Sequence, residues 1–227
     1  MDRLVLLDID KTLLMGSIFH YTALKAALSQ VYGIKNPCYV HNMQGMTDLK
    51  IICETLTMEK LDLNTIKSGL NECMELMYLN LKTVLQNNDL LVLDGVKPLL
   101  ETLQKHEIPM GLVTGNIESM VWLKLEKVGL NKYFQFGGFG DKVIKRRNLV
   151  KDAITESEKY IGKINYKNIF LVGDTPRDIV AGQKLGVKTI AVATGDFTIE
   201  EINNTGADFI LNNLKETKKV LNIILNQ

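Results

Sequence analysis

A short apolar run near the start of the chain, Leu4–Leu7, is followed at once by two carboxylates, Asp8 and Asp10. Four consecutive apolar residues without polar alternation are typical of a strand that is buried on both faces, as in a parallel sheet. Ligands of open parallel sheets bind outside the carboxyl ends of the strands, which is where these two aspartates lie. The stretch therefore predicts both a fold class and the place of a site.

From residue 90 onward, short apolar runs alternate with segments of helical periodicity, a pattern typical of βαβ units around a parallel sheet. The apolar run at residues 4–7 fits the same sheet. We therefore expect an α/β fold with a Rossmann-like parallel sheet core flanked by helices. The expected strands cover residues 110–113, 134–136, 169–172, 189–192 and 209–211, and the expected helices cover 96–105, 117–128, 149–160, 179–185 and 215–225.

Residues 15–90 contain no convincing strand and interrupt this alternation with helical periodicity. Helices are expected after Ser17 and Thr47, which can cap them, and over residues 63–85. The chain passes between the two parts twice, near residues 14–17 and 88–95, and tethering at two points suits a lid. The expected organisation is a core of residues 1–14 and 91–227 with an inserted helical-bundle cap domain of residues 15–90.

The charge balance and the cysteines narrow the classes of partner. With 27 Lys and Arg against 26 Asp and Glu, the formal charge of +1 gives no global bias toward nucleic acid or an anionic membrane. No apolar run approaches the roughly 20 residues of a spanning helix, and no secretory leader precedes the first strand. Three cysteines without CxxC spacing favour reduced thiols. We expect a cytoplasmic protein without a nucleic-acid or membrane partner, and the oligomeric state stays open.

Two later strands also end in polar groups. The sequence Thr114-Gly115-Asn116 follows one predicted strand and opens a helix, so a hydroxyl and backbone N–H groups can hold an anion such as phosphate there. Asp174 and Asp178 follow another strand. With the two acids after the first strand they form two carboxylate pairs at neighbouring strand ends, and such like charges need a cation. A hard divalent ion with oxygen ligands meets that need.

Taken singly, each feature has an ordinary structural interpretation. Asp-x-Asp and Thr-Gly-Asn can be turn and helix-cap chemistry. The basic stretch Lys142–Arg147 can be a solvated surface, and Gly-Asp-Thr-Pro can simply start a helix. Their occurrence in order, at the ends of strands of one predicted sheet, favours a functional site.

In this order, the segments Asp8–Leu13, Thr114–Asn116, a basic residue and Gly173–Asp178 resemble the motifs of the haloacid dehalogenase-like hydrolase superfamily. The resemblance covers nearly the whole chain. The helical insertion is similar to the C1-type cap of phosphoglycolate phosphatases and β-phosphoglucomutases, and Gly45–Asp48 resembles a cap-loop pattern of that branch.

The resemblance implies a phosphatase that depends on Mg²⁺ and acts on a small phosphorylated metabolite, a phosphate monoester of the phosphoglycolate or sugar phosphate type. Asp8 is then the nucleophile that forms an aspartyl-phosphate, and Asp10 is the general acid and base. The implied metal ligands are Asp8, Asp10 through its backbone carbonyl, Asp174 and Asp178. The implied phosphate-binding residues are Thr114, Gly115 and Asn116, and Arg146 or a neighbour balances the charge of the nucleophile.

Two positions depart from the family pattern. Lys11 stands where the family commonly has glycine, and lysine adopts positive φ at a higher cost; we expect it to be tolerated, with its ammonium near the phosphate. The basic residue of the third motif is ambiguous because the sequence has no Lys-Pro-x-Pro landmark. Counting back from Ala153, as in relatives that use arginine, points to Arg146, with Lys145 and Arg147 as alternatives.

Three other functions can be compared with that of a phosphatase. Dehalogenation needs no metal and would have little use for Asp10 together with Asp174 and Asp178. A phosphosugar mutase stays open, because His20 lies where β-phosphoglucomutases also carry a histidine. A non-catalytic module that only binds a phosphorylated ligand is the third, and the unusual Lys11 is its sole support.

Substrate choice is expected to depend on the insertion, because a cap closes on the leaving group. The candidate specificity residues there are His20, Thr47 and Asp48.

Overall fold

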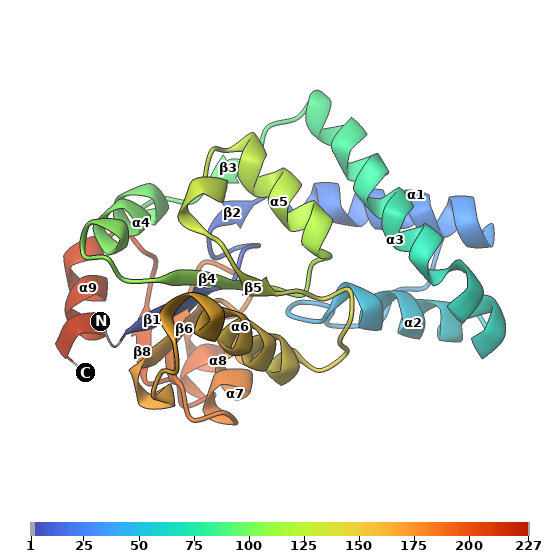
Figure 1. Ribbon diagram of the computed structural model, residues 1–227. Coiled ribbons are helices and arrows are strands. Elements are labelled where there is room, and N and C mark those ends of the chain that lie inside the picture. Colours follow the sequence, from blue (N-terminus) through green and yellow to red (C-terminus); the bar gives the residue numbers. More distant parts are fainter. Residues whose placement is uncertain (1–2, 227) are drawn as a thin grey trace.

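The computed structural model describes residues 3–226, and within them a six-stranded parallel sheet forms the centre of the protein (Figure 1). The strand order is β5-β4-β1-β6-β7-β8. From β1 the chain continues to β4 and β5 on one side and then crosses to β6 on the other, so a topological switch point lies at β1. The strands are β1 (Leu4–Leu7), β4 (Met110–Val113), β5 (Gly137–Gly138), β6 (Ile169–Gly173), β7 (Lys188–Val192) and β8 (Phe209–Leu211).

Both faces of β1 are buried, as its unbroken apolar sequence predicts. Val5 and Leu7 belong to the apolar cluster on one face of the sheet, and Leu4 and Leu6 belong to the cluster on the other. The structure thus confirms the Rossmann-like α/β core. The first face is covered by α4 (Val96–Lys105), α5 (Glu118–Lys127) and α9 (Thr217–Asn226), and the second by α6 (Arg146–Ile161) and α7 (Pro176–Gln183).

The insertion forms three helices that lie together at the end of the molecule opposite both termini (Figure 1). They are α1 (Ser17–Tyr32), α2 (Asp48–Met58) and α3 (Leu63–Gln86). The segments on either side of the insertion pair as a two-stranded antiparallel sheet of β2 (Leu14–Met15) and β3 (Leu91–Val92). Apolar side chains of α1–α3 join the cluster under α4 and α5. The division into a core and a cap domain stays a prediction.

Several local predictions were wrong. Residues 14–15 form β2, although no strand was expected between the first strand and residue 90, because a two-residue strand has no periodicity to detect. Helix α1 has Gly16 as its N-cap, so Ser17 is the first helical residue and makes no capping hydrogen bond. The edge strand falls on β5 and not on residues 134–136. A Cβ on Gly138 would lie 1.9 Å from the carbonyl oxygen of Leu149, so the close packing of α6 requires glycine there.

Three short helices were not predicted: α8 (Ile199–Asn203) and the 3₁₀ helices η1 (Asn131–Tyr133) and η2 (Tyr166–Asn168). Helix α8 is held by a capping box in which Thr198 and Glu201 bond each other's backbone N–H groups. Its five residues are too few to show a helical period.

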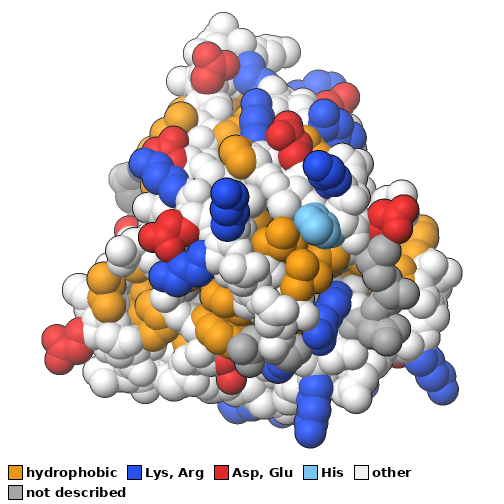
Figure 2. Space-filling model, turned by 90° about the vertical axis from the view of Figure 1, so that its left-hand side faces the viewer, with side chains coloured by type: hydrophobic (Ala, Val, Ile, Leu, Met, Phe, Trp, Pro, Cys, Tyr) orange, Lys and Arg blue, Asp and Glu red, His pale blue; other side chains and the backbone are white. Residues whose placement is uncertain are grey.

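The face that carries both termini shows acidic and basic side chains interspersed with small apolar patches (Figure 2). It therefore offers no patch of a single charge. Over residues 3–226, none of the helices combines the length and the apolar character needed to cross a membrane.

Candidate active site

The carboxyl ends of β1, β4 and β6 bring three predicted site residues together. Asp8 follows β1, Thr114 follows β4 and Asp174 follows β6. The backbone N–H of Asp8 donates to the carbonyl oxygen of Val172 at 2.9 Å, which continues the pairing of β1 with β6 to Asp8. These residues border a cavity of about 110 Å³ that is also lined by residues 43–46 and 48 of the insertion.

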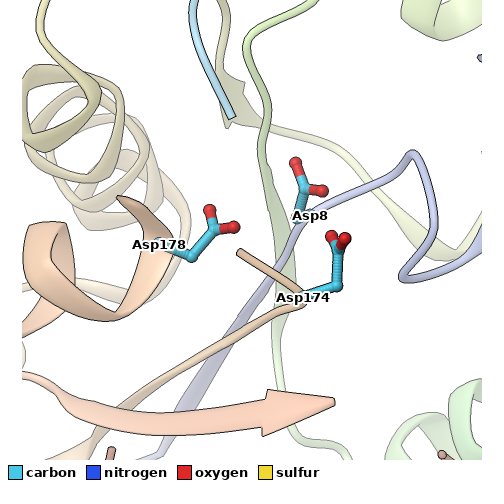
Figure 3. A group of neighbouring side chains, drawn as sticks. All are labelled: Asp8, Asp174 and Asp178. Atoms are coloured by element: carbon cyan, nitrogen blue, oxygen red, sulfur yellow. The ribbon is translucent and has the colours of Figure 1, made fainter. Parts of the chain in front are cut away.

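Asp8, Asp174 and Asp178 form a buried carboxylate cluster (Figure 3). One carboxylate oxygen from each lies within 4.8 Å of the others. Burial raises the pKa of Asp8 to about 7, against the opposing charge of Arg146 and with the support of Asp178. Burial also raises the pKa of Asp174 to about 8, and the charges of Asp8 and Asp178 add to the shift. The cluster therefore holds more negative charge than its surroundings neutralise.

Arg146, the first residue of α6, is the cation that reaches this cluster. Its Nη2 donates to Asp8 Oδ1 at 2.6 Å and to Asp178 Oδ1 at 2.6 Å, and its Nε donates to Asp178 Oδ1 at 2.9 Å. Burial acts to lower the pKa of Arg146, but the charges of Asp178 and Asp8 raise it overall, so the guanidinium stays charged. Lys145 and Arg147 are exposed. Of the three alternatives, the structure brings only Arg146 to Asp8.

The cluster fits a magnesium ion by the chemistry of its donors. All three groups offer carboxylate oxygens, the ligands that hard divalent cations prefer. Burial first and then the neighbouring carboxylate charges raise the pKa values of Asp8 and Asp174, and a cation would favour the ionised form of both. Asp178 is already occupied, because its Oδ1 accepts from Arg146 and its Oδ2 accepts from the Thr175 hydroxyl at 2.6 Å. Asp8 and Asp174 are therefore the better candidates for direct ligands, with Asp178 supporting them.

The side chain of Asp10 points away from this cluster to a second cation. Lys124 Nζ donates to Asp10 Oδ2 at 2.8 Å and Oδ1 at 3.0 Å, and to Asn116 Oδ1 at 2.6 Å. Asn116 Nδ2 donates to Asp10 Oδ2 at 2.9 Å, which closes a three-residue network. Burial acts to raise the pKa of Asp10, but the charges of Lys124 and His20 and the hydrogen bonds from Lys124 and Asn116 together outweigh it, so the pKa lies below its ordinary value. Asp10 is thus held as a carboxylate beside the cavity.

The predicted phosphate-binding segment packs directly on the insertion. A Cβ on Gly115 would lie 1.9 Å from the carbonyl oxygen of Met46, so only glycine fits there. The Gly115 carbonyl accepts from Asp48 N at 2.7 Å. The Thr114 hydroxyl accepts from Asn116 N at 3.3 Å and faces the cavity. Any ligand held by Thr114–Asn116 is therefore within reach of residues from the insertion.

The three candidate specificity residues occupy different positions. His20 and Asp48 are buried, line the cavity and bond each other, with 2.8 Å between His20 Nε2 and Asp48 Oδ1. Asp48 Oδ2 also accepts from Ile117 N at 2.8 Å, so an acid of the insertion caps the start of α5. Thr47 does not border the cavity; its hydroxyl accepts from Lys50 N and caps α2.

Lys11 adopts the left-handed backbone that its glycine-like position requires. Its φ is 64°, a conformation that costs an L-residue about 1 kcal/mol or more. The Lys11 ammonium borders the cavity and pairs with Asp196. The hydrogen bond from Lys11 lowers the pKa of Asp196 below its usual range. The lysine is therefore accommodated with the backbone geometry of a glycine.

Lys124 is the site residue that sequence reasoning missed. It is 1% exposed and lies on the buried stripe of α5 that also contains Met120, Val121 and Leu125. A signal was present, because a lysine at an apolar position of an amphipathic helix is almost never buried unless its charge is paired. The sequence does not name the partner, which follows the first strand more than a hundred residues earlier.

The chain belongs to the haloacid dehalogenase-like hydrolase family, whose model matches residues 5–192. It is 23% identical over 181 residues to PpaX, a pyrophosphatase by name, of Clostridium perfringens, covering 75% of this chain and 81% of that one. It is 28% identical over 121 residues to the phosphoglycolate phosphatase of Photorhabdus laumondii, and the match covers 53% of this chain and 51% of that one. The crystal structure of β-phosphoglucomutase from Clostridium difficile is similar in fold, with a TM-score of 0.76 at 14% identity over 100% and 98% of the two chains.

Proposed function

We propose that this protein is a phosphatase that uses Asp8 as a nucleophile and depends on Mg²⁺. The observation that carries the proposal is the placement of Asp8 at the end of the central strand, in a buried oxygen cluster with Asp174 and Asp178 and in contact with Arg146. The names of relatives in the family support the same activity.

The residues have separate tasks in this proposal. The Asp8 carboxylate attacks phosphorus, forming a bond from its oxygen to phosphorus while the bond to the leaving oxygen breaks. Asp10 gives the leaving oxygen a proton that it took from water in the preceding hydrolysis step, and it takes the next proton from the water that hydrolyses the aspartyl-phosphate. Thr114 and the backbone of Gly115 and Asn116 hold the phosphoryl oxygens. Mg²⁺ at the carboxylate cluster supplies charge neutralisation for the phosphoryl group.

The cavity favours a small substrate. A volume of about 110 Å³ is several times the 10–15 Å³ that a single water needs, but it is well below the roughly 300 Å³ at which drug-sized ligand sites begin. A phosphoryl group with a short polar leaving group fits this space with the insertion closed. Phosphoglycolate, pyrophosphate and short sugar phosphates are the classes to test.

The deciding experiment measures phosphate release from p-nitrophenyl phosphate and then from a panel of these substrates, with Mg²⁺ and with EDTA. We expect activity that requires Mg²⁺ and that falls by roughly 10⁴-fold or more in Asp8→Asn. Asp152→Asn, an exposed acid on α6, is the matched control and should keep wild-type activity. Activity of Asp8→Asn near that of the control would refute the proposal, and phosphate-ester binding without turnover in the wild type would favour a binding module.

A mutase is the second candidate, because His20 is buried at the cavity and its Nδ1 has no hydrogen-bond partner among the described residues. A free ring nitrogen of this kind could serve a sugar hydroxyl. Isomerisation of a hexose 1-phosphate that depends on a bisphosphate primer, and that is lost in His20→Gln, would place mutase activity first. Phosphate release without isomerisation would leave the phosphatase assignment in place.

A further inference from the structure

A second cavity, of about 530 Å³, lies beside the active site, and its charged lining is entirely basic. Gly45, Met46 and Arg146 border both cavities, so the two are separated by one loop of the insertion and one side chain. The other charged residues around the second cavity, which we call the basic cavity, are Lys50, Lys145, Arg147, Arg177 and Lys184.

Most of this positive charge has no compensating acid. Arg146 is neutralised by Asp8 and Asp178. Lys50 has Glu54 at 3.6 Å on its own helix. Arg177 donates to backbone carbonyls of residues 42 and 44, which leaves its charge unbalanced. For Lys145, Arg147 and Lys184, the described part of the chain offers no ion-pair partner. The concentration is local, since the whole chain carries a formal charge of only +1.

The start of α6 adds to the positive potential of the basic cavity. Lys145 is the N-cap of α6, no side chain caps this end, and no acid lies in the first turn. The positive end of a helix dipole disfavours cations, so Lys145 and Arg147 are placed against the local field. An anion in the cavity would be attracted by both the side chains and the helix end.

The basic cavity also has an apolar wall. Ile144 is 51% exposed and Val180 is 39% exposed, and both border the cavity together with Met46. Its volume lies within the range of about 300–1,000 Å³ that is usual for small-molecule sites. The lining therefore suits a molecule that carries both phosphate groups and an apolar ring. No carboxylate borders the cavity in the described structure, so binding and not catalysis is the chemistry it offers.

We propose that the basic cavity binds a phosphorylated organic molecule of nucleoside diphosphate size, separately from the phosphoryl group that reacts at Asp8. The phosphates lie against Arg147, Lys184 and the start of α6, and the ring lies against Ile144 and Val180. Because Gly45, Met46 and Arg146 border both cavities, the bound molecule acts on the active site as an effector.

The test is calorimetric titration of ADP into the full chain with Mg²⁺, using Asp8→Asn so that no covalent chemistry can occur. We expect one ADP per chain. The double variant Arg147→Glu with Lys184→Glu should weaken binding by about tenfold or more, since each lost contact is a charged hydrogen bond. The matched control, Lys151→Glu with Lys163→Glu, changes the net charge equally at exposed positions outside the cavity and should bind ADP as well as its parent.

Turnover of p-nitrophenyl phosphate by the wild type, measured with and without ADP, distinguishes ADP bound in the basic cavity from ADP bound in the active site. ADP that changes kcat without being hydrolysed supports the effector site. ADP that is hydrolysed, or that only raises KM by competition, belongs to the active site and overturns the proposal. Equal ADP binding by both double variants, no ADP binding at all, or binding of an oligonucleotide in its place would also overturn it. The titration does not require catalysis, so it stands or falls independently of the phosphatase activity.

Discussion

Arg146 and Lys124 approach the end of the same strand from opposite faces of the sheet. Arg146 comes from α6 and pairs with Asp8 and Asp178, whereas Lys124 comes from α5 and pairs with Asp10, with Asn116 as a further hydrogen-bond partner. The pKa of Asp8 is consequently raised and that of Asp10 lowered, although only Ile9 separates them. In the proposed mechanism, this contrast would let one strand end hold a nucleophile whose charge a metal balances and a proton carrier whose charge Lys124 balances.

Replacement of Arg146 should have the largest effect on this contrast. Arg146→Met leaves the two buried carboxylates Asp8 and Asp178 without their cation, and breaking a buried ion pair costs about 3–5 kcal/mol. We expect phosphatase activity to fall by roughly 10³-fold, with a lower melting temperature. Arg146→Lys should recover part of both, because it restores the charge without the planar fork. Lys151→Met, on the exposed side of α6, is the control, and an equal loss there would refute the role of Arg146.

Replacement of Lys124 should have a smaller effect that is specific to Asp10. Lys124→Met removes the ammonium that holds the pKa of Asp10 low, so that pKa rises. Asp10 must be ionised to accept a proton from water, and the acidic limb of the kcat profile should therefore move to higher pH. We expect about a 10²-fold loss of kcat near neutral pH.

The control for Lys124 is Lys127→Met on the same helix, whose partner Asp89 is exposed. Lys124→Arg should keep the acidic limb of the kcat profile at the wild-type pH, because it keeps a cation at that position. If Lys124→Met lost stability but kept the wild-type pH profile, its role would be packing alone.

The smallest expected effect is the change that pH makes in the stabilisation of the fold by Mg²⁺. The pKa values of Asp8 and Asp174, about 7 and about 8, lie above the ordinary value of 3.8. Without metal, the protonated acids stabilise the fold at low pH, and this stabilisation is lost as pH rises through those values. Metal binds the deprotonated acids, so the stabilisation by Mg²⁺ should grow with pH.

Thermal unfolding with Mg²⁺ and with EDTA measures this effect. The difference in melting temperature should be small near pH 5.5 and reach roughly 5 °C near pH 8.5. Asp174→Asn should abolish most of the difference. A difference that is independent of pH would argue against a metal at the carboxylate cluster.

The centre of the sheet could be predicted from the sequence because β1, β4 and β6 are fully buried and therefore largely apolar without interruption. Met110–Val113 and Phe209–Leu211 have their predicted bounds. The edge strand β5 could not be predicted, since its two glycines are required by close packing, of Gly137 against Leu112 and Phe139 and of Gly138 against α6, and not by strand propensity. Pairs such as β2 with β3 depend on tertiary contact and leave no local signal.

The candidate site was predictable where a residue directly follows a strand, and less so where it arrives from a helix. Asp8, Thr114 and Asp174 needed only the strand pattern. Arg146 was one of three candidates until the direction of α6 distinguished it from its exposed neighbours. Lys124 was missed because its partner is distant in sequence, and burial of a lysine is visible only once α5 is packed on the sheet.

The division of labour between Asp8 and Asp10 is tested most directly by the first turnover of Asp10→Asn with p-nitrophenyl phosphate. This leaving group needs little protonation, so attack by Asp8 should proceed while hydrolysis of the aspartyl-phosphate stalls. Rapid-quench kinetics should show a burst of about one p-nitrophenolate per chain, and mass spectrometry should find one phosphoryl group on Asp8. A linear time course without a burst, or a phosphoryl group on another residue, would contradict the assignment.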